Sequence, residues 1–205
     1  MAKVLDIDLR QVEPHDLQPA VDALRTGGVI IYPTDTIYGL GCDITSPQAV
    51  KRVQQIKGRD ANKPMSFVCA NLRDISRYAR VSEYAQGLLE RCLPGAYTFV
   101  LPATYNAPDI LTAGQQTVGL RIPDHPIPLA LVNALGVPIL STSANFSTQE
   151  VITEPRDLEK HMGELVDVIV ASGSLPVQPS SVVSLVGDKA TVLRAGGGDL
   201  SPFQH

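Results

Sequence analysis

Tryptophan is absent from this sequence of 205 residues, and aromatic residues make up only 5% of it. There are only three cysteines, Cys42, Cys69 and Cys92, and only four histidines, and neither set has the close spacing of zinc ligands. No apolar run approaches the roughly 18 residues of a membrane-spanning helix. A zinc centre, a disulfide framework, histidine-centred catalysis and a membrane span are therefore not indicated. We expect a cytoplasmic protein whose cysteines are reduced and buried.

Three motifs common in nucleotide-binding proteins and hydrolases are missing as well. The sequence contains no G-x-G-x-x-G, no G-x-x-x-x-G-K-S/T and no G-x-S-x-G, which argues against the folds that carry those loops. The glycine run at residues 196–198 has no helix signal after it, so it does not predict a phosphate loop. Any functional site must therefore be sought in other polar clusters.

Apolar residues are abundant enough to form a core. Hydrophobic residues make up 44% of the chain and charged residues 19%, proportions typical of a globular protein rather than a disordered one. A domain of this size buries about 70% of the surface that its unfolded chain exposes. Because glycine and proline are scattered instead of gathered at a boundary, we expect residues 1–205 to form a single domain with no additional C-terminal domain.

Charge is unevenly distributed along the chain. The whole sequence has 17 basic and 21 acidic residues, a formal net charge of −4, which argues against binding of nucleic acid over the whole surface. Residues 51–80 nevertheless hold eight Lys or Arg residues against two Asp residues. Such a local cationic surface suits a polyanionic ligand of limited size, such as a nucleotide, and it equally suits a solvated helix face. Charge alone leaves both interpretations open.

The hydrophobic pattern alternates between strand-like and helix-like segments, which predicts an α/β fold with helices packed on a mixed sheet. The turn at Gly187-Asp188 predicts that the two strands it joins are antiparallel. Because ligands of open α/β sheets usually lie beyond the strand ends, we expect functional groups directly after the strands. The predicted strands are residues 4–9, 29–32, 65–69, 97–101, 118–122, 137–140, 166–171, 182–186 and 190–193, and the predicted helices are residues 14–26, 46–57, 82–92, 126–135 and 155–163.

Two polar clusters occur in the first third of the chain. The hydroxyl groups of residues 32–41 either bind a polar ligand or satisfy the backbone of a turn. The second cluster, Lys57-Gly58-Arg59 with Lys63, ends a predicted basic helix. The helix dipole explains one cation there, whereas several cations on a glycine-containing loop fit a phosphate clamp better.

Two further clusters occur in the middle of the chain. Residues 117–126 place Arg121 among Val, Leu and Ile in a predicted strand. An arginine in that position either pairs with a buried acid or binds an anionic ligand, and both interpretations stay open. Ser141-Thr142-Ser143-Ala144-Asn145 directly follows an apolar strand. This cluster is either a strand exit or helix cap, or a set of neutral groups that orients phosphate, ribose or amino-acid atoms.

The ordered clusters resemble the motifs of the YrdC/YciO family, whose YrdC-type members are threonylcarbamoyl-AMP synthases. The resemblance implies a single twisted mixed-sheet α/β domain with helices packed on it and a large central concave cavity. It also implies synthesis of threonylcarbamoyl-AMP and pyrophosphate from L-threonine, bicarbonate and ATP, a step in threonylcarbamoyladenosine modification of tRNA. The matching segments are residues 32–40, 57–59, 94–98, 117–126, 141–145, 180–183 and 193–194.

The same resemblance implies a role for individual residues. The Lys-x-Arg pair is Lys57 and Arg59, the Ser-x-Asn pair is Ser143 and Asn145, and these four are the expected catalytic residues. Magnesium is expected to arrive with ATP, with no tightly bound cofactor and no metal ligands in the protein. The expected ATP-binding residues are Arg59, Lys63, Thr117, Ser143 and Arg194, and the expected threonine-binding residues are Thr34, Arg121, Ser141 and Ser180.

The C-terminal tail resembles a different branch of the family. Residues 173–203 are similar to YciO-type members, which often lack the Lys-x-Arg and Ser-x-Asn pairs that this chain has. The alternative to a synthase is therefore a YciO-like paralogue that binds RNA or a nucleotide without turnover. In that case residues 51–80 contact tRNA or double-stranded RNA, although the scarcity of aromatic residues argues against base stacking. Proteins that act later in tRNA modification are further candidate partners.

Overall fold

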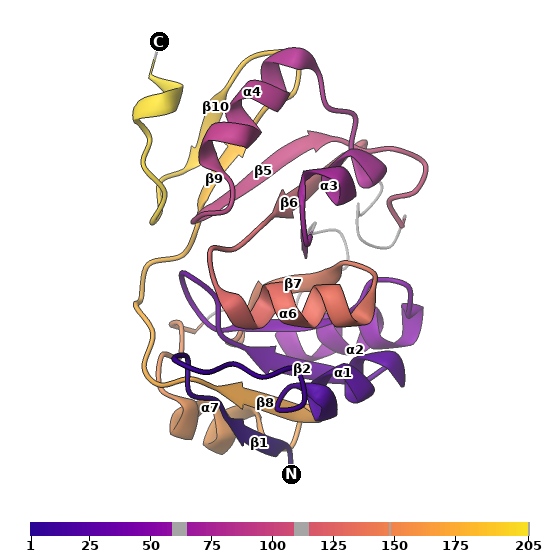
Figure 1. The fold of residues 1–205 in the computed structure, drawn as a ribbon, viewed down its shortest axis with the longest axis vertical. Coiled ribbons are helices and arrows are strands. Elements are labelled where there is room, and N and C mark those ends of the chain that lie inside the picture. Colours follow the sequence, from indigo (N-terminus) through magenta and orange to yellow (C-terminus); the bar gives the residue numbers. More distant parts are fainter. Residues whose placement is uncertain (59–64, 109–114, 148, 205) are drawn as a thin grey trace.

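The computed structural model describes residues 1–58, 65–108, 115–147 and 149–204, and these contain a ten-stranded mixed sheet with packed helices (Figure 1). Across the sheet the strand order is β1-β8-β2-β3-β7-β4-β6-β5-β9-β10. The strands are β1 (Lys3–Asp6), β2 (Val29–Tyr32), β3 (Gly39–Asp43), β4 (Ser66–Val68), β5 (Tyr97–Pro102), β6 (Thr117–Arg121), β7 (Ile139–Ser143), β8 (Val168–Ala171), β9 (Ser181–Ser184) and β10 (Thr191–Arg194). The helices are α1 (Gln18–Arg25), α2 (Pro47–Lys57), α3 (Leu72–Tyr78), α4 (Glu83–Cys92), α6 (Pro126–Leu135), α7 (Pro155–Met162) and the 3-10 helix η1 (Ser201–Phe203).

The predicted α/β fold and the mixed sheet are confirmed. Strands β4 and β6 are parallel, as are β5 and β9, whereas β3 and β7 are antiparallel. Strands β9 and β10 form the expected antiparallel pair. Gly187 and Asp188 in their connection have φ values of 74° and 53°, the left-handed conformation that a tight hairpin turn requires.

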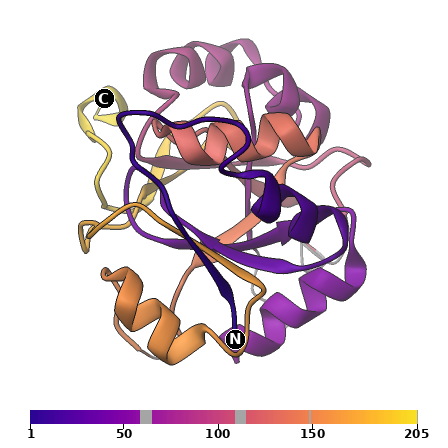
Figure 2. The ribbon, with the colours of Figure 1, turned by 60° about the horizontal axis from the view of Figure 1, so that its bottom comes forward.

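Two helix pairs cover opposite faces of the first strands of the sheet. Ile30 and Tyr32 of β2 pack in a core cluster with residues of α1 and α6. Val29 and Ile31, which alternate with them, pack in a second cluster with residues of α2 and α7. Figure 2 shows the strands passing between these two helix layers. All four residues of β2 are buried, as expected for a strand covered on both sides.

Some elements were not predicted and others have different boundaries from those predicted, for identifiable reasons. Strand β3 was not predicted, because its sequence Gly-Leu-Gly-Cys-Asp has two glycines and little β-propensity. Helix α3 was not predicted either, because its seven residues give too short a periodic pattern. Helix α1 begins four residues later than expected, after a turn at residues 14–17. Strand β7 extends to Ser143, so most of the fourth polar cluster lies within a strand and not after one.

Close packing explains the glycine run at residues 196–198. A Cβ atom on Gly198 would lie 2.4 Å from the ring of Tyr97, and one on Gly196 would lie 2.3 Å from the carbonyl oxygen of Pro179. The Ser181 hydroxyl donates to the Gly198 carbonyl at 2.8 Å and accepts from the Gly196 N–H at 3.0 Å. The segment after β10 is thereby held against β5 and β9, which fixes the end of the strand that carries Arg194.

Candidate active site

A hollow lies over one face of the central strands because the residues on that face are small. Ser141 of β7 pairs with Ser66 of β4, and Ser66 pairs with Gly119 of β6, so these three residues form a row across the sheet. In the next row on the same face, Val68 and Ile139 pack in the core cluster of α1 and α6. The change from large apolar residues to Ser and Gly leaves the floor of the hollow without side chains that could fill it.

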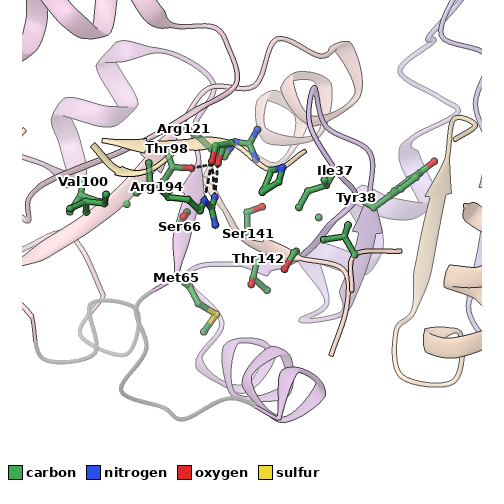
Figure 3. Close-up of a pocket in the computed structure, with 18 of the residues that line it drawn as sticks. Ile37, Tyr38, Met65, Ser66, Thr98, Val100, Arg121, Ser141, Thr142 and Arg194 are labelled. Atoms are coloured by element: carbon green, nitrogen blue, oxygen red, sulfur yellow. Dashed lines mark hydrogen bonds between the residues drawn. The ribbon is translucent and has the colours of Figure 1, made fainter. Parts of the chain in front are cut away.

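The hollow is a cavity of about 500 Å³, within the range of about 300–1,000 Å³ typical of small-molecule sites. Arg121, Arg194, Ser66 and Ser141 are arranged around it (Figure 3). The cavity lies at strand ends and also over the strands themselves: Arg121, Ser143 and Arg194 are the last residues of β6, β7 and β10. Residues 117, 119 and 121 all line the cavity, because alternate residues of a strand project from the same face of the sheet.

Six of the predicted site residues meet at this cavity although they come from distant parts of the chain. They are carried by β6, β7, β10 and the segment before β9. Thr34, Lys57 and Asn145 are described by the structure but are not among its lining residues. Arg59 and Lys63 lie outside the described residues. The six predicted residues that line the cavity are Thr117, Arg121, Ser141, Ser143, Ser180 and Arg194.

Arg121 is a cavity-lining residue and also the partner of a buried acid. Its Nη2 atom donates to Oδ1 of Asp35 at 2.7 Å and to the Thr36 hydroxyl at 3.2 Å. The side chains of Arg121 and Asp35 are only 8% and 10% exposed. The two interpretations left open by the sequence are therefore compatible, because Arg121 binds Asp35 through Nη2 and still lines the cavity.

Arg194 reaches the cavity from the outermost strand. The pairing of β10 with β9 shifts between Val192 and Arg194, and such an irregularity re-aims the side chains next to it. The Arg194 guanidinium donates through Nη2 to the Ser180 carbonyl at 2.8 Å, and the Ser180 hydroxyl lies 2.9 Å from that of Thr98. Burial, followed by the positive charge of Arg121, lowers the pKa of Arg194. This end of the cavity therefore combines two guanidinium groups with two hydroxyl groups.

Lys57 is buried and its ammonium group binds the end of β7. It is the last residue of α2, is 3% exposed, and its ammonium group donates to the Ser143 carbonyl at 2.8 Å and to Oδ1 of Asn145 at 2.7 Å. The Ser143 hydroxyl donates to the same Asn145 oxygen at 2.6 Å. The Lys-x-Arg and Ser-x-Asn pairs are thus joined through Lys57, which holds the chain at the end of β7, where Ser143 lines the cavity.

Thr34 shapes the turn between β2 and β3. Its hydroxyl donates to the Ile37 carbonyl at 2.7 Å and accepts from the Thr36 N–H at 3.2 Å. Ile37, held in this way, lines the cavity. In the structure this threonine therefore has the turn-stabilising role that the sequence left as one of two alternatives.

Comparisons with known proteins place the chain in a family. The family model for Sua5, YciO and YrdC, described as "Telomere recombination", matches residues 22–196. The chain belongs to the Sua5/YciO/YrdC family. "Uncharacterized protein YciO" of Escherichia coli is 36% identical over 189 residues, which cover 91% of this chain and 92% of the relative. The YciO crystal structure from this bacterium matches with a TM-score of 0.94 at 34% identity over 100% of both chains.

Other Sua5/YciO/YrdC members are named for an activity or a ligand. "Threonylcarbamoyl-AMP synthase" of Vibrio vulnificus is 34% identical over 158 residues, which cover 76% of this chain and 85% of the relative. The structure of P. abyssi Sua5 complexed with L-threonine matches with a TM-score of 0.88 at 30% identity. That match covers 96% of this chain and 58% of the Sua5 chain, so this chain spans little more than half of that protein.

Several residues at the site were missed by sequence reasoning. Ser66 and Thr98 line the cavity, yet each stands alone among apolar residues, so no polar cluster signals it. The period-2 alternation of β5 would have placed Thr98 and Val100 on one face. Asp35 lies within residues 32–41, the first polar cluster, and nothing in the sequence links it to Arg121, 86 residues away.

The basic segment has partners within the fold for some of its charges. Arg52 forms an ion pair with Asp167 at 2.6 Å and also donates to the Leu165 carbonyl at 2.8 Å. The guanidinium of Arg77 lies 5.6 Å from the centre of the Tyr78 ring, a cation–π contact. Arg73 and Arg80 are exposed. Contact of this segment with RNA stays a prediction.

All three cysteines are buried free thiols, as expected. Burial raises the pKa of Cys42 to about 12, so its thiol is not a nucleophile near neutral pH. Among the described residues no group of three or more His, Cys, Asp or Glu side chains could hold a metal ion. Of the helices in the described part of the chain, none is both long and apolar enough to span a membrane.

His125 is the N-cap residue of helix α6 and lies in the segment directly after β6. Its Nδ1 atom accepts a hydrogen bond from the Ile127 N–H at 3.3 Å. Its Nε2 atom is buried without a hydrogen-bond partner in the described structure. Burial lowers the pKa of His125, while Asp35 and Asp124 act in the opposite direction. The lowered pKa and the hydrogen bond accepted by Nδ1 both favour the neutral imidazole, because protonation of Nδ1 removes the acceptor that caps the helix.

This environment predicts a pH dependence of stability. Because the pKa of His125 is lower in the folded state than its ordinary value of 6.5, the unfolded state binds the proton more readily. The stabilisation that neutral His125 contributes is therefore fully present above pH 6.5, the ordinary pKa. It is lost as the pH falls through the lower pKa of the folded state. Urea unfolding from pH 8 to 5 should show a smaller loss of stability in His125→Asn, whose amide oxygen still caps the helix. Parallel pH profiles for the two proteins would contradict this assignment.

Proposed function

We propose that this protein is an L-threonylcarbamoyladenylate synthase that forms threonylcarbamoyl-AMP and pyrophosphate from L-threonine, bicarbonate and ATP. The observation that carries the proposal is the convergence of Arg121, Ser143, Ser180 and Arg194 on one cavity. Two guanidinium groups suit anionic substrates, and the neutral hydroxyl groups suit an amino acid and a sugar. The product would serve the modification of adenosine in tRNA, in the cytoplasm.

The proposed division of the cavity follows from its charges. Arg121 would bind the threonine carboxylate, with Ser141 and Ser180 around the amino acid. The hydroxyl of Tyr32 donates to Ser141 at 2.8 Å, and burial raises the pKa of that tyrosine to about 12, so the donor stays protonated. Arg194, Thr117 and Ser143 would bind ATP, together with Arg59 and Lys63. Magnesium would enter with ATP as part of that substrate.

The proposed reaction needs no protein nucleophile. The threonine amine attacks carbon dioxide derived from bicarbonate, forms a nitrogen–carbon bond and loses a proton to give a carbamate. A carbamate oxygen then attacks the α-phosphorus of ATP, and the bond from that phosphorus to the oxygen bridging to the β-phosphate breaks, which releases pyrophosphate. The cationic groups would stabilise charge that grows on the phosphoryl oxygens and on the leaving group. Enclosure by the cavity would protect the labile carbamate from water.

A second candidate is a paralogue that binds a nucleotide or RNA without turnover. Its support is the similarity to YciO, which covers more of both chains than the similarity to the synthase of Vibrio vulnificus. Against it stands the complete Lys57, Ser143 and Asn145 arrangement described above. The two candidates predict different results in the same assay.

Pyrophosphate release separates these candidates. Purified protein supplied with ATP, bicarbonate and magnesium should release pyrophosphate only when L-threonine is added, and mass spectrometry should detect threonylcarbamoyl-AMP. As a control, calorimetry in the same buffer should show that the sample binds ATP and is therefore folded and competent for binding. ATP binding without release would favour the paralogue, and release without threonine would show that another reaction takes place.

A further inference from the structure

Asp35 lies behind Arg121 and connects two loops at the cavity. Its Oδ1 atom accepts from Nη2 of Arg121 at 2.7 Å, and its Oδ2 atom accepts from the Asp124 N–H at 3.1 Å. One carboxylate thereby ties the turn after β2 to the loop after β6. Asp35 itself is not among the described residues that line the cavity, so it is placed to act on a ligand through Arg121 and not by direct contact.

The contacts of Arg121 fix the plane of its guanidinium. Nη2 has two acceptors at once, Asp35 Oδ1 and the Thr36 hydroxyl. Because a guanidinium is planar and rigid, two acceptors on one nitrogen also determine where its other donors point. The buried Nε–H of Arg121 has no hydrogen-bond partner within the described part of the chain. The protein contacts that fix this guanidinium are therefore those of Nη2 with Asp35 and Thr36.

Asp35 also balances charge at the cavity. No acidic residue is found among the described lining residues, whereas Arg121 and Arg194 both line it. Arg121 contributes to the lowered pKa of Arg194, so the two guanidinium groups repel each other. Asp35 offsets one of these positive charges without itself lining the cavity.

We propose that Asp35 is a positioning residue that fixes the guanidinium of Arg121 for the carboxylate of the amino-acid substrate. This inference rests on the proposed function. It assigns specificity for the carboxylate to a pair of residues instead of to Arg121 alone. Removal of the Asp35 charge should therefore weaken threonine binding more than ATP binding, because the expected ATP contacts of Thr117, Ser143 and Arg194 do not involve Asp35.

The test uses Asp35→Asn, which keeps the shape of the side chain and one acceptor oxygen. Calorimetry should show a Kd for L-threonine about 10- to 100-fold higher than in the native protein, the size of effect that misplacement of a binding group produces. The Kd for ATP should stay within about twofold of the native value. In turnover assays the KM for threonine should rise more than kcat falls. Asp124→Asn is the matched control, because it removes a neighbouring exposed carboxylate while its backbone N–H remains.

A substrate-independent measurement keeps the two proposals separate. NMR of the Arg121 Nε–Hε group should show restricted rotation of the guanidinium in the native protein and in Asp124→Asn, and faster rotation in Asp35→Asn. If native protein binds threonine and Asp35→Asn binds it equally well, the positioning role is overturned and the proposed function stands. If native protein binds no threonine, the proposed function fails, and unchanged rotation in Asp35→Asn would then also refute the positioning role. Equal weakening of threonine and ATP binding would indicate a structural role only.

Discussion

Replacement of Lys57 with methionine should reduce threonine-dependent pyrophosphate release at least about 100-fold and also destabilise the fold. Methionine keeps the apolar stem but removes the ammonium group that donates to Ser143 and Asn145. The acceptors left behind are buried, and loss of a charged donor to buried acceptors costs about 2–4 kcal/mol. The end of β7 would lose its anchor, and Ser143 would no longer be held at the cavity wall. Chemical denaturation and the pyrophosphate assay measure the two effects.

Lys51→Met is the matched control for this experiment. Lys51 is an exposed residue of the same helix, so its replacement should leave turnover and stability close to native values. Lys57→Arg tests whether positive charge alone is sufficient. It keeps the charge, but its guanidinium is larger than the buried ammonium group that it replaces. Native turnover in Lys57→Met would show that the link between Lys57 and the Ser-x-Asn segment is dispensable. Lost turnover at native stability would instead indicate direct action of the ammonium group on substrate.

Under the proposed function, replacement of Arg121 with methionine should lower threonine-dependent turnover at least about 100-fold, because the threonine carboxylate would lose its proposed cationic partner. The same change should lower the free energy of unfolding by about 3–5 kcal/mol, since it leaves the carboxylate of Asp35 buried without its partner. Denaturant unfolding near neutral pH measures the second effect. Calorimetry with L-threonine measures the first.

The double variant Arg121→Met with Asp35→Asn distinguishes lost binding from lost stability. Neutralising Asp35 removes the uncompensated charge, so the double variant should recover at least half of the stability lost by Arg121→Met. Threonine-dependent turnover should stay as low as in the single variant. Recovery of turnover along with stability would mean that Arg121 supports the fold without binding substrate, and absence of any recovery would mean that its pairing with Asp35 contributes little.

Secondary structure could be predicted where the periodic pattern was strong. Residues 29–32 and 126–135 were predicted with the boundaries that the structure has, because one is a continuous apolar strand and the other is framed by Pro126 and Gly136. Strand β3 was missed because glycine carries no β signal. The polar end of β7 was missed because serine and threonine there face a cavity, and a polar residue in that setting looks like a residue exposed to solvent.

The residue types at the site could be predicted, but their partners could not. Arg121 stood out as a cation within an apolar strand, yet its contact with Asp35 depends on the path of the chain between two residues that are 86 positions apart. Lys57 was expected to contact phosphate because it lies near other cations at a helix end. In the fold its ammonium group donates to carbonyl and amide oxygens at the end of β7. These partners lie 86 and 88 residues away along the chain, so only the tertiary structure reveals them.

The row of Ser141, Ser66 and Gly119 has a consequence for how this scaffold can change. Backbone hydrogen bonds hold these residues in register, and a Cβ atom on Gly119 would already lie 3.2 Å from the Ser66 hydroxyl. A methyl group added at any of these positions would therefore make the cavity shallower. The backbone hydrogen bonds between the strands would be retained. Under the proposed function, exchanging single side chains in this row would change which amino acids the cavity admits, without rebuilding a loop.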